Sequence, residues 1–276
     1  VYKAIAVLAV LALVPSIASA GTTFAFDLRG PDNLFSFEAT TPLVQTQIGP
    51  VDLVGYAPYA MDFNTAGTIL YVVNHMPGTL ELGTVDTTTG VYTAGPAIPS
   101  VTVTETGLSV DPTDETIYMS TATSLLTLDP VTGGTGYICD FVDAVGTPLA
   151  IVIDIAIDNG GQMFAHDIDS DSLYSIDKTT AVATLVGPSG LAANFAQGMD
   201  FDPTTNLLYA AIYTGGGTGS YGTWDTTTGV FSEILDLPSF PDPTADGREL
   251  EMAIRIPEPA TLSLLALGAL GLLRRR

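Results

Sequence analysis

The sequence predicts an all-β fold, a β-propeller of five four-stranded blades that the C-terminal strand of the body closes. Three observations support this prediction. Two different sequence phrases recur with a period in the mid-forties, the length of four antiparallel strands with their turns. The first repeat lacks its first strand, and a matching strand follows the last repeat. No segment between the two ends of the chain shows an apolar pattern of helical period and useful length.

The first phrase is an apolar strand, a turn that begins with Asp or Asn, and a strand that carries an aromatic residue. The residues that begin its turns are spaced by 47, 47 and 44 positions; they are Asn64, Asp111, Asp158 and Asp202. The second phrase is a strand that ends in Asp, followed by a turn rich in Thr and Gly. Its aspartates are spaced by 43, 48 and 48 positions; they are Asp86, Asp129, Asp177 and Asp225. Because an Asp side chain bonds to the backbone two residues on, we expect these aspartates to form hairpin turns.

The two ends of the body complete each other. Residues 24–26, 34–38 and 44–48 match the second, third and fourth strands of a blade, whereas residues 251–255 match a first strand. We therefore expect residues 251–255 to complete the first blade, which removes the exposed sheet edges. Two alternatives remain open: a sixth blade if residues 213–248 contain further strands, and a long two-sheet sandwich.

Residues 1–20 have the pattern of a secretory signal peptide. Lys3 precedes an apolar run that Pro15 interrupts, and Ala18-Ser19-Ala20 is the small-x-small pattern of a signal peptidase site. We expect cleavage between Ala20 and Gly21. A membrane anchor is the alternative, but the apolar run is shorter than the ~20 residues of a membrane span.

The C-terminal residues 257–276 have three parts: Pro257-Glu258-Pro259, an apolar stretch over residues 260–273, and the arginines Arg274, Arg275 and Arg276. As a helix, 14 apolar residues span about 21 Å, which is short for a ~30 Å hydrocarbon core. The flanking arginines can snorkel and are expected to stop transfer on the cytoplasmic side. The sequence therefore predicts a signal peptide (1–20), a propeller domain (21–256) and a transmembrane tail (257–276), with short hydrophobic helices at both ends.

The order Pro-Glu-Pro, apolar stretch and arginines at the C-terminus resembles the PEP-CTERM sorting signal of Gram-negative bacteria. This resemblance implies that an exosortase recognises the tail, that processing occurs near Pro257-Glu258-Pro259, and that the protein reaches the cell surface or extracellular matrix after transient membrane anchoring. The body resembles secreted β-propellers of the YVTN/NHL-like kind in its repeat length and turns. Neither resemblance implies an activity, because this tail is attached to many unrelated bodies.

The chain is strongly acidic, with 8 Lys and Arg against 30 Asp and Glu and a formal charge of -22. Without the two ends only four basic residues remain: Arg29, Lys178, Arg248 and Arg255. Such a surface repels polyanions, so nucleic acid and anionic lipid are not expected as partners of the body. Cys139 is the only cysteine, which excludes an intrachain disulfide, and we expect it to be a small buried apolar residue.

Carboxylates on the predicted innermost strands are the candidate site. The innermost positions are Asp62, Ser109, Asp154, Asp200 and Glu251. Several carboxylates near one axis favour a cation such as Ca²⁺. Strand alternation places Asp62 and Asp200 level with Ser109, and Asp154 and Glu251 two residues earlier. The alternative is that these polar residues form hydrogen bonds between the blades.

A second candidate calcium site is the stretch Asp167-Ile-Asp169-Ser-Asp171. The twelfth position of this stretch is Lys178, where an EF-hand needs a bidentate Glu, so an EF-hand is excluded. A looser calcium loop and a solvated acidic loop both remain open. His75 and His166, the only histidines, do not occupy equivalent repeat positions, which argues against a zinc site or a catalytic triad.

These patterns predict a non-enzymatic surface or matrix protein with a binding or scaffolding role and no catalytic residues. The expected partners are signal peptidase and exosortase during export, and exopolysaccharide or surface proteins afterwards. One alternative is a secreted metal-dependent, lactonase-like hydrolase that uses Asp62, Asp154, Asp200 and Glu251. Another is calcium-bridged attachment to an anionic exopolysaccharide.

Overall fold

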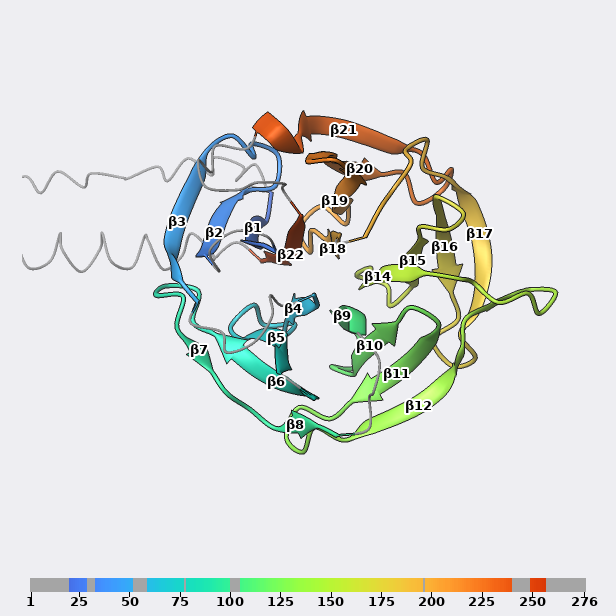
Figure 1. The fold of residues 1–276 in the computed structure, drawn as a ribbon, viewed down its shortest axis with the longest axis horizontal. Helices are drawn as coiled ribbons and strands as arrows, with labels where there is room; N and C mark the ends of the chain where they lie inside the picture. Colours follow the sequence, from blue (N-terminus) through green and yellow to red (C-terminus); the bar gives the residue numbers. More distant parts are fainter. Residues whose placement is uncertain are drawn as a thin grey trace, which may run out of the picture.

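The computed structural model is a β-propeller: the strands form five sheets arranged radially around one axis (Figure 1). The structure describes residues 20–28, 33–51, 59–76, 78–99, 105–195, 197–239 and 249–256. Each sheet is a blade of antiparallel strands. One blade, the fourth, has an additional strand that pairs in the parallel direction. We number the blades from first to fifth in chain order.

The strands of each blade are given from the axis outwards. The first blade contains β22 (Leu250–Arg255), β1 (Thr22–Asp27), β2 (Asn33–Glu38) and β3 (Gln45–Pro50). The second contains β4 (Met61–Phe63), β5 (Leu70–Met76), β6 (Thr79–Val85), and β7 (Tyr92–Thr93) with β8 (Ala97–Ile98), which both pair with β6. The third contains β9 (Glu105–Val110), β10 (Ile117–Thr121), β11 (Ser124–Leu128) and β12 (Thr135–Asp140).

The fourth blade contains β14 (Val152–Ile157), β15 (Met163–Asp167), β16 (Ser172–Ile176) and β17 (Val182–Pro188). A short strand, β13 (Val142–Asp143), extends it by pairing parallel to β17. The fifth blade contains β18 (Gly198–Phe201), β19 (Leu208–Gly215), β20 (Thr218–Trp224) and β21 (Phe231–Asp236), followed by the 3₁₀ turn η1 (Leu237–Ser239). The described part of residues 213–248 therefore belongs to the fifth blade, and the fold is neither a six-bladed propeller nor a sandwich.

The predicted hairpin turns are confirmed in atomic detail. Asp86 Oδ1 accepts hydrogen bonds from the backbone N–H groups of Thr88 (2.7 Å) and Thr89 (3.0 Å). Gly90 has φ +79° and donates its N–H to the Asp86 carbonyl (2.8 Å). A residue with a Cβ rarely adopts this φ, which explains the glycine at the end of the turn.

The C-terminal strand closes the first blade as predicted. β22 pairs antiparallel with β1, with Thr22 opposite Arg255 at one end and Asp27 opposite Leu250 at the other. Strands from the two ends of the body therefore share one sheet. Leu250, Met252, Ala253 and Ile254 are at most 2% exposed. The innermost strands β22, β4, β9, β14 and β18 each contact the next around the axis, and the ring is continuous.

The hydrophobic core lies between the blades. Phe24 of the first blade packs edge-on against Phe63 of the second, with ring centroids 5.4 Å apart. Phe37 of the first blade packs against Tyr221 of the fifth at the same separation, and the Tyr221 hydroxyl donates to the Ala39 carbonyl (3.0 Å). Aromatic residues of the repeating strands therefore join neighbouring blades.

Cys139 lies in β12, the outermost strand of the third blade, and is partly exposed; the expectation of a buried cysteine was wrong because that strand faces solvent. The predicted hydrophobic helices at residues 1–20 and 257–276 lie outside the described residues, apart from Ala20. In the part of the chain that the structure describes, no helix has the length and apolar character to cross a membrane.

The closure leads to a first prediction. A chain that ends after Glu249 should lose the cooperative thermal transition that a chain ending after Ile256 shows. The deleted strand buries four apolar side chains, each contributing about 1–3 kcal/mol, and their sum is comparable to the whole stability of a domain. Circular dichroism melting of both chains measures this, and equal melting temperatures would show that closure does not hold the ring.

Candidate functional site

The candidate site is built from the innermost strands, whose inner edges face the axis. The strand registers make Asp62, Ser109 and Asp200 equivalent, because their partners on the second strands are Tyr71, Tyr118 and Tyr209. Ala156 and Ala253 occupy the same level. Asp154 and Glu251 lie two residues earlier, level with Ala60, Gly107 and Gly198. The two predicted layers of acidic residues are therefore present.

The carboxylates bind backbone N–H groups of the neighbouring blade. Asp62 Oδ2 accepts from Val110 of the third blade (2.7 Å), and its Oδ1 accepts from Phe63 (2.6 Å). Asp200 repeats this geometry: Oδ2 accepts from Ile254 of the first blade (2.6 Å), and Oδ1 accepts from Phe201 (2.7 Å). Each of these two aspartates therefore fastens its own innermost strand to the next one.

The other two axial acids, Asp154 and Glu251, also accept hydrogen bonds from backbone N–H groups. Asp154 Oδ1 accepts from Ile155 (2.7 Å), and the backbone N–H of Met199 in the fifth blade also stabilises its charged form. Glu251 Oε1 accepts from Met61 of the second blade (3.2 Å). Three of the five blade junctions thus have an acidic side chain that accepts a hydrogen bond from the backbone of the next innermost strand, and at a fourth junction Asp154 lies near Met199.

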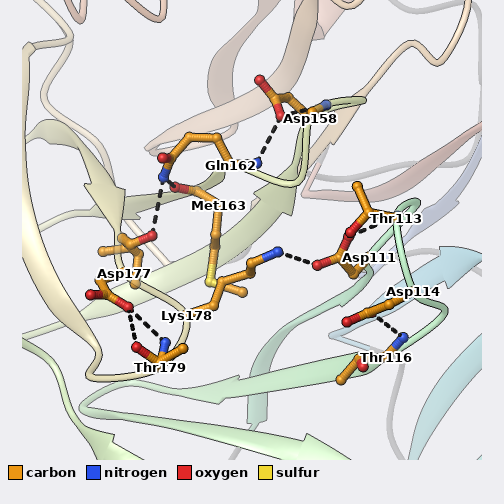
Figure 2. Close-up of polar contacts among 12 residues, drawn as sticks. Asp111, Thr113, Asp114, Thr116, Asp158, Gln162, Met163, Asp177, Lys178 and Thr179 are labelled. Atoms are coloured by element: carbon orange, nitrogen blue, oxygen red, sulfur yellow. Dashed lines mark hydrogen bonds and ion pairs between the residues drawn. The ribbon is translucent and has the colours of Figure 1, made fainter.

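The junction between the third and fourth blades is built differently. Its innermost strand has Gly107 and Ser109 in place of acids, and a Cβ at Gly107 would collide with the Asp154 carboxylate. Here Asp111, at the end of β9, forms an ion pair with Lys178 of the fourth blade; Figure 2 shows the Lys178 ammonium directed at the Asp111 carboxylate. Close backbone approach and an ion pair replace the carboxylate bond at this junction.

Burial dominates the electrostatics of the axial acids. It raises the pKa of the Asp62 carboxyl to about 7, against the lowering effect of the Val110 and Phe63 N–H groups. It also raises the pKa values of Asp154 and Asp200 well above their ordinary value, and Coulombic repulsion from Asp62 adds to both shifts. On the fourth blade, burial lowers the pKa of His166, the strand partner of Asp154, to about 4. Near neutral pH the three aspartates therefore share protons rather than all being charged.

A cavity of ≈ 190 Å³ opens on the axis at the C-terminal ends of the innermost strands. Asp62 and Asp200 line it. An apolar ring surrounds them, with one residue from every blade: Phe63, Val110, Ile157, Phe201 and Ile254. Further lining residues are Asn64, Thr65, Pro112, Asn159, Pro203 and Ile256. We call this cavity the axial pocket.

The axial pocket combines two features of a binding site. Its apolar ring provides apolar walls, and its two buried carboxyl groups are the kind of convergent polar group that orients a ligand. Sequence reasoning missed the ring, although one signal was available. The residue that follows each of the five equivalent positions Asp62, Ser109, Ala156, Asp200 and Ala253 is apolar. This regularity indicates that the five following residues share a common environment.

The predicted calcium ligands are not gathered into one centre. Among the described residues, no group of three or more His, Cys, Asp or Glu side chains is arranged to hold a metal ion. Asp167 accepts from Ile151 N–H (2.8 Å) and the Ser170 hydroxyl (2.7 Å). Asp171 accepts from Ala193 N–H (2.7 Å), and Asp169 is exposed. These residues order a loop, and calcium binding at either place stays a prediction.

The structure describes the residues of the predicted signal-peptidase site but not those of the predicted C-terminal processing site. Gly21 is buried next to β22, and Ala20 is half-buried. Pro257, Glu258, Pro259, Arg274, Arg275 and Arg276 lie outside the described residues. The last described residue, Ile256, lines the axial pocket, so the C-terminal tail begins at the edge of this cavity.

Comparison with known proteins supports the sorting tail and the fold. Residues 255–276 match the model of the PEP-CTERM protein-sorting motif. A chain of the nidogen/laminin complex is similar in structure, with a TM-score of 0.52, 12% identity, and coverage of 85% of this chain and 98% of that one. TolB from Acinetobacter baumannii has the same TM-score and 10% identity, over 85% of this chain and 66% of its own. At these identities the likeness shows the fold alone.

A structural genomics protein of unknown function from Bacteroides thetaiotaomicron matches 68% of this chain with 16% identity and a TM-score of 0.49. The chain spans 52% of that protein's length, and this match carries no argument. Comparison with curated proteins found no significant match.

Fold and tail together define the class: a five-bladed β-propeller with neighbours among TolB-like propellers and a C-terminal PEP-CTERM sorting motif. This motif implies processing by an exosortase, export, and sorting to the surface of a Gram-negative bacterium.

The raised acid pKa values give a second prediction. A folded-state carboxyl pKa above the unfolded value means that the folded protein holds more protons, so stability falls as pH rises through that folded pKa. The lowered pKa of His166 has the opposite effect, but only below its unfolded value of about 6.5. We therefore expect the melting temperature to fall between about pH 6.5 and pH 8, where Asp62 titrates.

Replacing the titrating group separates this effect from others. Asp62→Asn should flatten the pH dependence, because the amide does not ionise, and should lower stability by about 1–3 kcal/mol, because one backbone N–H loses its acceptor. Asp86→Asn is the matched control, since Asp86 uses only Oδ1 in an exposed turn. An unchanged pH profile in Asp62→Asn would contradict the assignment.

Proposed function

We propose that this protein is an exported, exosortase-sorted surface propeller that binds a small cationic group in its axial pocket. Its signal peptide (1–20) is removed between Ala20 and Gly21, residues 21–256 form the binding domain, and the tail (257–276) holds the protein at the membrane until processing. The single observation that carries the binding role is the axial pocket, to which all five blades contribute and at which two buried carboxyl groups meet.

The chemistry of the pocket favours an organic ammonium group. The cavity is smaller than the roughly 300–1,000 Å³ of typical small-molecule sites, so it accepts one functional group rather than a whole large ligand. A cation that enters relieves the repulsion between Asp62 and Asp200 and favours their charged forms. The apolar ring suits the carbon stem of such a group, whereas Ca²⁺ takes 6–8 oxygen ligands. A lysine side chain of a surface protein or an amino group of an exopolysaccharide has this chemistry.

The carboxylate bonding also favours binding over catalysis. A lactonase-like hydrolase would use Asp62, Asp154, Asp200 and Glu251 as metal ligands. Each of these side chains already accepts a backbone N–H from the next blade or its own strand. Their first task is structural, and redirecting Asp62, Asp200 or Glu251 to a metal would break bonds that join the blades.

The position of the tail links binding to sorting. The sorting motif begins within one residue of Ile256, which lines the pocket. While the tail is attached, the pocket end of the propeller therefore faces the membrane. Processing would release this end toward the matrix.

A third prediction tests the ligand class. Calorimetric titration of residues 21–276 in detergent at pH 7.5 with n-butylammonium should give a dissociation constant of about 0.1–10 mM, the range expected for a five-atom ligand. Asp62→Asn and Asp200→Asn should each weaken binding at least about tenfold, and Asp86→Asn should leave it unchanged.

Two results would count against the proposal. Absence of binding, or binding that neither pocket variant weakens, would remove the axial pocket as the site. Binding of Ca²⁺ but not of n-butylammonium, lost in both variants, would replace the organic ligand by a metal ion.

A fourth prediction concerns sorting. Replacing Pro257, Glu258 and Pro259 by alanine should leave the full-length tail on the protein and the protein in the membrane fraction, whereas the natural chain is shortened in an exosortase-containing host. Mass spectrometry of fractionated cells measures both. Pro99→Ala, at an exposed proline of the body, is the control. Normal shortening of the triple variant would show that this motif does not direct processing.

A further inference from the structure

Two turns that follow innermost strands have nearly the same geometry, but only one of them has a lysine beside its aspartate. Asp111 and Asp202 occupy equivalent positions after β9 and β18, and both are fully buried. Oδ1 of each accepts the N–H of a threonine two residues on, Thr113 or Thr204, at 2.9 Å. Each turn ends with a residue of positive φ, Glu115 (65°) or Asn206 (58°). The two aspartates therefore have the same turn geometry at Oδ1 but different partners at Oδ2, which accepts the Thr205 hydroxyl in Asp202 (2.7 Å) and faces Lys178 in Asp111.

The next blade supplies a cation to Asp111. Lys178, in the turn after β16, places its Nζ against Asp111 Oδ2 (Figure 2). Burial alone raises the pKa of Asp111, but Lys178 and Thr113 together keep it below the ordinary value. A buried carboxylate needs such compensation, because a lone charge out of water is strongly destabilising.

The first blade offers no lysine at the equivalent place beside Asp202. Met163 pairs with Ile157 and Ile176, just as Thr23 pairs with Ile254 and Phe37. This register makes Ala39 the equivalent of Lys178, and Gly21 the equivalent of Gly161.

No described lysine or arginine forms an ion pair with Asp202 in this part of the fold. Arg255, the described cation of the same junction, is directed elsewhere. Its Nη1 donates to the Thr87 hydroxyl of the second blade (3.1 Å), and its guanidinium lies 4.8 Å from the centre of the Phe24 ring.

The backbone of Gly21 takes the place next to Asp202. A Cβ on Gly21 would lie 2.9 Å from Asp202 Oδ1 and 2.5 Å from Ile254 Cγ2, so only glycine permits this approach. Its carbonyl accepts the N–H of Ala39 (3.1 Å), which fixes the residue at the start of β1. The nitrogen of Gly21 is bonded to the same Cα as this Cβ position, so it lies within about 5.5 Å of Asp202 Oδ1.

We propose that signal-peptide cleavage creates the missing cation: the new α-ammonium group of Gly21 pairs with Asp202 and locks the first blade to the fifth. This inference rests on the proposed export and on cleavage between Ala20 and Gly21. Hydrolysis of that peptide bond consumes one water, leaves a carboxylate on Ala20 and frees an amine on Gly21. The amine takes a proton at neutral pH, since an α-amino group has a pKa of about 7.7–8.0.

The device ties stability to export. In the precursor the Gly21 nitrogen is an uncharged amide, and the buried Asp202 faces no ammonium group there. In the mature chain the ion pair sits at the junction where β22 and β1 close the ring. The last stabilising interaction of the closure is thus completed only after translocation.

Three forms of the chain to residue 276, in detergent, test this inference: one that begins at a free Gly21, the same chain with an acetylated Gly21, and one that begins at Ala20. At pH 6.5 the free Gly21 chain should melt at least about 5 °C above the other two, because losing one partner of a buried pair is costly. Asp202→Asn should abolish this difference.

The substitution Ala39→Lys places a lysine at the position in the first blade that Lys178 occupies in the fourth. This second test does not depend on whether the Asp202→Asn variant folds. The substitution should raise the melting temperature of the acetylated chain and leave that of the free Gly21 chain almost unchanged. Lys178→Ala is the matched control at the other junction, and it should lower all three forms equally.

Equal melting of the three forms would overturn the ion pair while leaving the proposed export intact. Mass spectrometry of the exported protein should find Gly21 at the N-terminus. A different N-terminus would overturn both the cleavage site and the inference that rests on it.

Discussion

The inner edge of each innermost strand is the constraint on which this structure depends. In a propeller these edges face the axis, where no further strand can pair with their backbone N–H groups. A buried N–H without an acceptor is costly, and an unpaired edge invites pairing with another chain. The protein meets this constraint with side chains: Asp62, Asp200 and Glu251 reach from one innermost strand to the backbone of the next.

This solution has an electrostatic consequence. Carboxylates that converge on one axis out of water repel each other, so burial and mutual repulsion raise the pKa values of Asp62, Asp154 and Asp200. Two of the groups that hold the blades together, Asp62 and Asp200, therefore also line the axial pocket. Structure and the proposed binding function share residues, which explains why the acids looked like metal ligands in the sequence. The junction between the third and fourth blades has no acid on the axis; Gly107 and the Asp111–Lys178 pair are found there instead.

Much of the fold was predictable because it is periodic. The spacing of the aspartates from Asp86 to Asp225 indicated the blades, and the match of residues 251–255 to a first strand indicated closure. The levels of the axial acids also followed from strand alternation. Their partners did not, because Asp62 bonds to Val110 and Asp200 to Ile254 through the spacing of neighbouring blades. No local pattern encodes that spacing. The approach of Gly21 to Asp202 was likewise invisible, since it exists only once the ring has closed.

We infer that side-chain carboxylates satisfy the axial edges of the innermost strands. Amide hydrogen exchange at Val110 and Ile254 tests it most directly, because the acceptors of these two N–H groups are Asp62 and Asp200 rather than a strand. We expect both amides to exchange only through global unfolding, as slowly as Ala210 inside β19. Rapid exchange of Val110 and Ile254 while Ala210 stays protected would contradict it.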